Sequence, residues 1–305
     1  TSVLSSTIGN ADLTLEAGRS INVNAGLNLD FGALTLIANS NNAAVQAANR
    51  DPGAGNIVIA ANQTVSTGPG FGVITLDVQD GGTVGGITLQ NNAAVNVFET
   101  TVNFQTAPGG FITLNTGAGI NTIGGNLNLI ADTIDLPAGA PIQASSGVGF
   151  TANITIAPAT VGRGIDIVTT AGAPGPTLEL EAQDLQNINL DGFADGRITI
   201  GNATTGDINI NGAFTPGGGG NAKDRVEFIS AGDFNINATL DGTGLTGVQT
   251  GHSFETTIGQ NIAVNAALNT GVNSLFQFGQ GGAGGSFTAG SSITSPSLSV
   301  VGGAG

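Results

Sequence analysis

The sequence contains no Cys, Met, Trp or Tyr, one His, and six Lys and Arg residues in 305. The lack of Cys excludes disulfides, thiolate nucleophiles and cysteine zinc sites, and His252 alone cannot build a multi-histidine metal site. The 21 Asp and Glu residues set a formal net charge of −15, so we expect no nucleic-acid partner. No apolar run reaches the roughly 18 residues of a membrane helix, so we expect a chain that does not span a membrane.

The abundant residues are Gly, at 51, and Asn, at 31. Gly does not recur at every third position, which excludes a collagen triple helix. Because the chain begins at Thr1 without a basic and then apolar leader, and closes on Gly and Ala, we interpret it as a segment of a longer protein.

Apolar and polar residues alternate in short bursts, such as Leu13-Thr14-Leu15 and Ile21-Asn22-Val23. Alternation at a period of two predicts strands with one buried face, whereas Gly, Asn and Thr are poor helix formers. Further bursts lie at 34–36, 57–59, 74–78, 87–89, 112–114, 127–129, 154–156, 165–167, 178–180, 188–190, 198–200, 208–210, 226–228, 234–236 and 262–264. The sequence therefore predicts an all-β chain with almost no helix.

Many bursts follow a Gly and one further residue, as in Gly125-Asn126-Leu127 and Gly206-Asp207-Ile208. A repeat of about 20 residues without a helical partner is typical of a β-solenoid. Gly and Asn suit its corners, and Asn, Thr and Ser can stack in hydrogen-bonded ladders. We predict a continuous shaft over 1–273 with about 20 residues per coil, followed by a Gly-rich terminal coil or linker over 274–305.

Three segments resemble the shafts of filamentous-haemagglutinin-like exoproteins, which two-partner secretion exports. They are 10–25 (NADLTLEAGRSINVNA), 124–131 (GGNLNLIA) and 260–269 (QNIAVNAALN), close to that family's G-x-D-L-T-L-x-A-G-x-x-I-x-V-N-A style. The resemblance covers most of 10–270 and implies a right-handed parallel β-helix, secreted to the bacterial cell surface. The sequence lacks the Asn-Pro-Asn motifs of that family's secretion domain, so the resemblance implies that this chain is part of the shaft and not of the secretion domain.

Carboxylate pairs are the candidates for catalysis, because β-helices also carry polysaccharide lyases and glycoside hydrolases. The pairs are Asp132 with Asp135, Glu179 with Glu181, and Asp191 with Asp195. We interpret them as residues of solvent faces and turns, since Arg, Lys, Tyr, Trp and His that would grip a sugar do not gather near them. Asp191 and Asp195, each followed by Gly, are the calcium candidates, and we expect no other cofactor.

Other residues have a structural interpretation. We interpret His252 as a turn residue and Lys223 as a surface lysine. Phe at strand positions is expected to stack inside the solenoid, whereas Phe276 and Phe278 are candidates for capping the fold or joining a partner. The Phe residues expected inside are Phe98, Phe104, Phe111, Phe228 and Phe234.

These patterns predict a non-enzymatic, extracellular structural or adhesive protein that forms a stiff shaft, fibre or surface layer. Its partners would be further copies or further segments of the same protein, through end-to-end or lateral β contacts. The alternative is a module on the same scaffold that binds a glycan or a cell surface. A third hypothesis is a polysaccharide lyase or glycoside hydrolase.

Overall fold

The computed structural model forms two compact units, unit 1 over Thr1–Ala152 and unit 2 over Asn153–Gly305, and each is described by itself. The structure describes residues 4–6, 11–42, 53–69, 72–136, 142–145, 152–190, 196–216, 225–245, 252–270, 275–278, 286–295 and 297–300.

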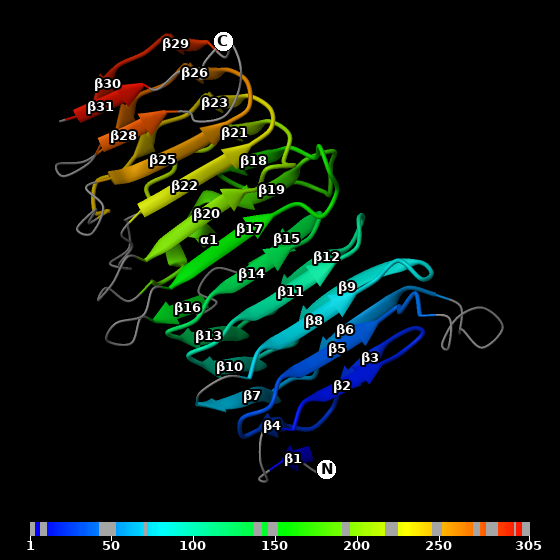
Figure 1. Ribbon diagram of the computed structural model, residues 1–305. Helices are drawn as coiled ribbons and strands as arrows, with labels where there is room; N and C mark the ends of the chain where they lie inside the picture. Colours follow the sequence, from blue (N-terminus) through cyan, green and yellow to red (C-terminus); the bar gives the residue numbers. More distant parts are fainter. Residues whose placement is uncertain are drawn as a thin grey trace. The chain divides into compact units, whose positions relative to one another are not determined.

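Unit 1 winds its strands through three parallel sheets, so each coil adds one strand to each sheet (Figure 1). The sheet orders are β1-β4-β7-β10-β13-β16, β2-β5-β8-β11-β14 and β3-β6-β9-β12-β15. The strands are β1 (Leu4–Ser6), β2 (Leu13–Glu16), β3 (Ile21–Val23), β4 (Leu27–Leu29), β5 (Leu34–Ala38), β6 (Gly55–Ile59), β7 (Thr64–Pro69), β8 (Ile74–Val78), β9 (Val84–Leu89), β10 (Ala94–Phe98), β11 (Val102–Thr106), β12 (Phe111–Leu114), β13 (Gly119–Ile123), β14 (Leu127–Ile130), β15 (Thr133–Asp135) and β16 (Ile142–Ser145).

Unit 2 repeats the principle, and its strands also lie in three parallel sheets. We call β19-β18-β21-β23-β26-β29 the ladder sheet and β17-β20-β22-β25-β28-β31 the charged sheet; the third is β24-β27-β30. The elements are β17 (Asn153–Ala157), β18 (Ile165–Val168), β19 (Leu178–Glu181), α1 (Ala182–Asn187), β20 (Arg197–Gly201), β21 (Ile208–Ile210), β22 (Arg225–Ser230), β23 (Phe234–Ile236), β24 (Leu240–Asp241), β25 (His252–Ile258), β26 (Ile262–Val264), β27 (Leu268–Asn269), β28 (Leu275–Phe278), β29 (Phe287–Ala289), β30 (Ile293–Thr294) and β31 (Ser297–Val300).

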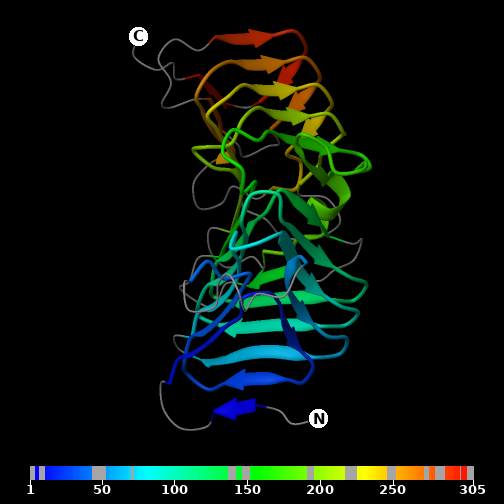
Figure 2. The same ribbon diagram turned by 90° about the vertical axis from the view of Figure 1, so that its right-hand side faces the viewer.

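This arrangement confirms the predicted all-β parallel β-helix, and Figure 2 shows successive coils lying over one another within each unit. The expected 20 residues per coil is too short for most coils. Residues that are hydrogen-bonded across one coil are 21 residues apart at Asp12 and Ala33, 26 and then 28 along Asn211, Asn237 and Asn265, and 43 from Asp166 to Asn209. The longest step is explained by the insertion of β19 and α1 between β18 and β21.

The core of each unit is a set of apolar columns, because register repeats the same inward position in every coil. Leu34 on β5 lies opposite Ile74 on β8, which lies opposite Val102 on β11, and all three side chains are fully buried. Burial of each such side chain contributes about 1.5–3 kcal/mol. In unit 2, Phe228 stacks on Phe234 with ring centroids 4.7 Å apart.

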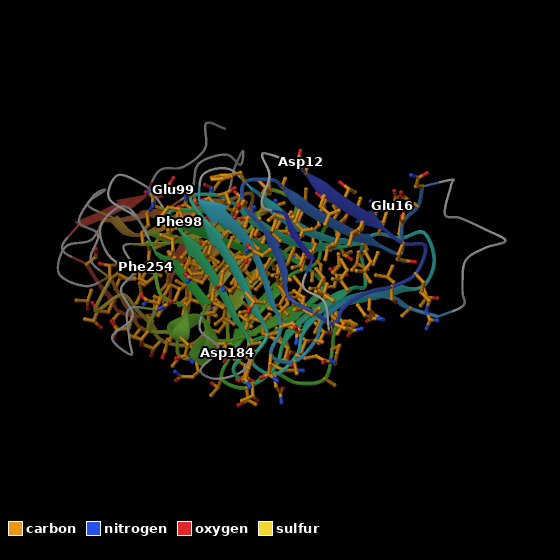
Figure 3. All side chains as sticks on the ribbon, turned by 90° about the horizontal axis from the view of Figure 1, so that it is seen from below. Asp12, Glu16, Phe98, Glu99, Asp184 and Phe254 are labelled. Atoms are coloured by element: carbon orange, nitrogen blue, oxygen red, sulfur yellow. The ribbon has the colours of Figure 1, made fainter. Side chains whose placement is uncertain are left out.

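The prediction that strand Phe residues fill the interior is right for three of the five positions and wrong for Phe98 and Phe111. Phe104, Phe228 and Phe234 are fully buried. Phe98 and Phe111 are half-buried and point outward, because Val97 and Ile112 take the neighbouring inward positions. Figure 3 labels Phe98 together with the buried Phe254. The ring of Phe111 lies over Gly86, its partner on β9.

α1 is six residues long and turns Ala182 and Leu185 toward the interior, where both are buried. The period-two pattern did not predict this element. Within the described part of the chain, no helix has the length and apolar character to cross a membrane.

β28, β29, β30 and β31 come from the terminal segment after residue 273. Each pairs in parallel with an earlier strand of its own sheet, as β29 does with β26 through Phe287 opposite Ile262. The boundary predicted at residue 273 stays a prediction.

Candidate functional site

The pair Asp132 and Asp135 does not form a catalytic pair of equivalent carboxylates. Asp132 is buried before β15, and its Oδ2 accepts a hydrogen bond of 2.7 Å from the backbone N–H of Gly109. Asp135, at the end of β15, is exposed. Asp132 therefore fixes a turn of the neighbouring coil.

Glu179 and Glu181 share the outward face of β19, as their spacing predicted, and both clamp the loop that precedes the strand. Glu181 Oε1 accepts from the backbone N–H of Ala171 at 2.9 Å, and Glu179 Oε2 accepts from that of Gly172 at 2.5 Å. These bonds satisfy donors that would otherwise point into solvent. Both carboxylates have a structural role in the loop.

The calcium candidates, Lys223 and the side chain of His252 lie outside the described residues. Calcium binding at Asp191 and Asp195 therefore stays a prediction. The backbone of His252 begins β25, but its side chain is not described. Within the described residues, no three His, Cys, Asp or Glu side chains lie close enough to hold a metal ion.

Phe276 and Phe278 belong to β28, and Phe276 lies in register between Phe254 on β25 and Leu298 on β31. Their side chains are outside the described part, so their predicted role in capping or joining a partner stays a prediction.

The structure brings together Asn and Asp residues that the sequence leaves far apart. On the ladder sheet, Asn235 Nδ2 donates to Asn209 Oδ1 at 2.9 Å, and Asn209 Nδ2 donates to Asp166 Oδ1 at 2.7 Å. Asp166 Oδ2 also accepts from Thr177 Oγ1 at 2.7 Å. An ionised carboxylate has no proton to donate, so Asp166 is the final hydrogen-bond acceptor at one end of this ladder.

A second ladder runs beside the first and joins residues that lie two positions further along the chain in each coil. Asn265 Nδ2 donates to Asn237 Oδ1 at 2.8 Å, Asn237 Nδ2 to Asn211 Oδ1 at 3.0 Å, and Asn211 Nδ2 reaches Asp166 Oδ1 at 3.5 Å. In both ladders the later coil donates to the earlier coil. Both therefore converge on Asp166.

The corner before the ladder sheet carries a third ladder. Asp207 Oδ1 accepts from the backbone N–H of Asp233 at 2.8 Å. Asp233 Oδ1 accepts from the backbone N–H and Nδ2 of Asn261 at 2.9 and 3.0 Å. Asn261 Oδ1 in turn accepts from Ser286. Side chains of one coil thus hold the corner of the next.

Beside this corner ladder lies a cavity of about 410 Å³, which we call the corner trough. Its small lining residues include Gly162, Gly206, Ala231 and Gly232, and its polar lining comes from Thr177, Asp207, Asn209 and Gln260. The repeated Gly-Asp pairs at 206–207 and 232–233 were visible in the sequence, but the trough exists only once the coils are stacked.

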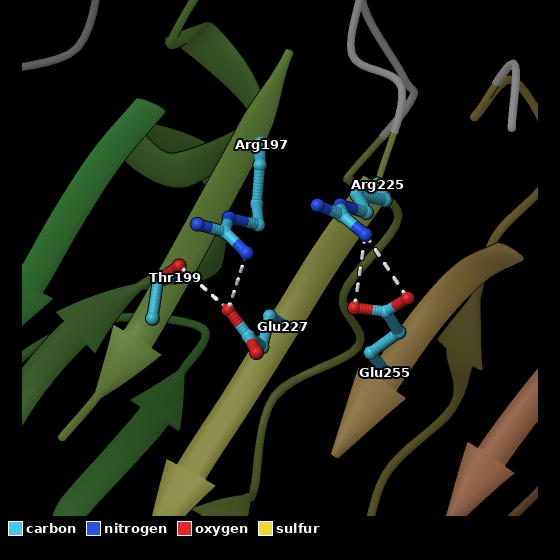
Figure 4. Close-up of polar contacts among 5 residues, drawn as sticks. All are labelled: Arg197, Thr199, Arg225, Glu227 and Glu255. Carbon is cyan, nitrogen blue, oxygen red and sulfur yellow. Dashed lines mark hydrogen bonds and ion pairs between the residues drawn. The ribbon is translucent and has the colours of Figure 1, made fainter. Parts of the chain in front are cut away.

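The charged sheet carries two diagonal ion pairs on its outer face (Figure 4). Arg197 Nη1 lies 3.2 Å from Glu227 Oε2, which also accepts from Thr199 Oγ1 at 3.0 Å. Arg225 Nη1 donates to both carboxylate oxygens of Glu255 at 3.0 Å. Register places Arg197 opposite Arg225 and Glu227 opposite Glu255, so the diagonal pairing offsets like-charge repulsion between neighbours.

These ion pairs stabilise the stack and do not form an open site. The four charged side chains retain between 13% and 29% exposure, and each carboxylate is already engaged by a guanidinium. Pairs of this kind contribute about 1 kcal/mol or less each.

No family model, no curated protein sequence and no solved structure matches the chain.

Proposed function

We propose that the chain is a non-enzymatic, extracellular structural and adhesive protein whose stacked β-coils form part of a shaft, fibre or surface layer. The observation that carries the proposal is the in-register repetition of the same outward hydrogen bonds from coil to coil, over apolar columns. A stack of this kind resists bending because each added coil engages its neighbour through backbone, core and side chain together.

Three of the carboxylates considered for catalysis, together with two others, support the same proposal. Asp132, Glu179 and Glu181 accept backbone hydrogen bonds, and Glu227 and Glu255 are bound to arginines. A glycosidase or lyase needs an acid and a base directed at one substrate bond. These five carboxylates are instead engaged in holding the coils.

Strand edges give the proposed shaft a way to extend. Among the described strands, β2 pairs only with β5, and Leu15 on β2 is 37% exposed although its register partner Leu36 is fully buried. An edge that combines unpaired backbone groups with a half-exposed apolar residue can accept a further parallel strand. The partner we propose is a further copy or a further segment of the same protein, at the bacterial cell surface.

The test is cryo-electron microscopy of the purified chain, with sedimentation velocity over a range of protein concentrations. We expect particles that lengthen with concentration and show an axial repeat of about 4.8 Å, the spacing of stacked strands. Particles of constant length and mass at every concentration would contradict assembly by strand addition.

A further inference from the structure

The corner trough runs along the solenoid and crosses several coils. The register Ile165, Ile208, Phe234 and Ile262 places the residues two positions earlier, Arg163, Gly206, Gly232 and Gln260, in one column. Of these, Gly206, Gly232 and Gln260 line the trough, together with Gly162 and Gly164 of the first coil. Four coils at the strand spacing give the trough a length of about 14 Å.

Close packing of the corners keeps the floor free of side chains. A Cβ on Gly206 would lie 2.3 Å from the backbone oxygen of Gly162, and a Cβ on Gly232 would lie 2.2 Å from Asp207 Oδ1. Glycine is therefore required at both positions for the coils to stack.

The polar groups that face the trough have unused hydrogen-bonding capacity. Asp207 uses Oδ1 to hold Asp233, and within the described part of the chain its Oδ2 accepts no hydrogen bond. The side-chain amide of Gln260 likewise has no partner there. Asn209 uses one N–H of its amide toward Asp166 and keeps the second. The trough thus offers a charged acceptor and amide donors.

The same lining excludes two ligand classes. Asp207 is the charged residue of the lining, and the guanidinium of the adjacent Arg163 is engaged by the backbone oxygens of Gly175 and Thr177, so an anionic polymer would meet the Asp207 carboxylate. The described lining residues include no aromatic ring or long aliphatic side chain, so an apolar ligand would gain little buried contact. A neutral, hydroxyl-rich chain satisfies both the acceptor and the amides.

We propose that the corner trough binds an extended neutral glycan, with about one β-linked pyranose residue for each coil. A β-1,4-linked chain advances by nearly one strand spacing per sugar and turns successive sugars to opposite sides, so the same hydroxyl groups would meet every second coil, as at Asp207 and Gln260. Asp207 Oδ2 and the Asn209 amide, which lie on one coil, bind hydroxyls of one sugar, and the Gln260 amide binds a hydroxyl of the sugar two coils further on. This inference rests on the adhesive part of the proposed function and supplies its ligand class.

The probe is cellohexaose, titrated calorimetrically into the whole chain in the presence of EDTA. Two variants address the trough by different means: Asp207→Asn keeps the Oδ1 acceptor but removes the charge, and Ala231→Gln fills the trough from its exposed rim. Each is expected to weaken binding about tenfold or more. Asp135→Asn, an exposed carboxylate on β15 in unit 1, is the matched control and should bind like the parent chain.

Thermal unfolding of every variant separates loss of binding from loss of fold. The proposal is overturned if cellohexaose does not bind, if it binds only when Ca²⁺ is restored, or if neither trough variant weakens it. Equal binding of oligogalacturonate would overturn the neutral-ligand assignment, and equal binding of maltohexaose would overturn the register match. Sedimentation without glycan tests shaft assembly separately, so failure in one experiment leaves the other proposal standing.

Discussion

At the scale of single residues, the approach of neighbouring coils decides where a side chain is tolerated. A Cβ on Gly125 would lie 1.6 Å from the backbone oxygen of Thr100 on the coil before it. Gly125→Ala should therefore lower the free energy of unfolding by about 1–3 kcal/mol, measured by urea denaturation. Gly109→Ala is the control: its φ is +85° and nothing lies within 4 Å of its Cβ, so only the strain of a left-handed residue, about 1 kcal/mol, is expected. Equal losses would show that overlap with Thr100 is not the cause.

The corners of unit 1 stack left-handed residues, with φ of 59° at Asn62, 57° at Asn92 and 72° at Gly117. Asn92 also donates through Nδ2 to Asn62 Oδ1 at 3.2 Å. Both Asn92→Ala and Asn92→Gly lose that bond, but only alanine pays the left-handed strain. We expect Asn92→Ala to unfold at lower urea concentration than Asn92→Gly, by about 1 kcal/mol in free energy. The reverse order would mean that the extra conformational entropy of glycine in the unfolded chain outweighs the left-handed strain of alanine.

Residue type alone could not assign these side chains their partners. The spacing of Glu179 and Glu181 correctly predicted that both lie on one face of a strand. Their hydrogen-bond donors, however, are the backbone N–H groups of Ala171 and Gly172 in an irregular loop. Phe98 shows the same limit for packing. Its position in β10 follows from alternation, whereas its outward direction depends on which alternate set, here Val95 and Val97, faces the core.

At the scale of elements, strands with a clear alternation of their own were predictable, as in β12 and β21, whereas strands such as β4 and β13 were not among the predicted ones. α1 was not, since its six residues are too few to show a helical period and two buried contacts, Ala182 and Leu185, decide its conformation. The coil length was underestimated for a related reason. Corner turns and inserted segments differ in length, and sequence shows where strands lie but not which pairs of strands are neighbours.

The ladders on the ladder sheet give an element-scale prediction. Asp166 accepts hydrogen bonds from Asn209, Asn211 and Thr177, so Asp166→Ala leaves three donors without their acceptor. We expect a loss of about 2–3 kcal/mol in the free energy of unfolding, because bonds to charged acceptors are the stronger ones. Asn265→Ala, which removes a single donor from the other end, should lose about 1 kcal/mol or less. Equal stability of the two variants would show that the ladders do not depend on Asp166 as their final acceptor.

At the scale of the whole molecule, stacked coils create features that no single segment contains. The lining of the corner trough comes from Gly162, Asp207, Gly232 and Gln260, which lie on four coils. Their sequence separations follow coil lengths that vary with every insertion. The sequence therefore predicted the class of fold and its repeating corners, whereas the trough required the register of the coils.

The exposed edge of β2 leads to a prediction about assembly. Leu15 is the register partner of the buried Leu36 and belongs to the same apolar column, yet its side chain is 37% exposed. Leu15→Lys places a charge where an added coil would continue that column, so the concentration-dependent lengthening seen by sedimentation velocity should be lost or reduced about tenfold. Thr14→Lys adds the same charge to the exposed outward face of the same strand and should leave assembly unchanged. Similar inhibition by both variants would point to net charge, and inhibition by neither would place the growing contact away from β2.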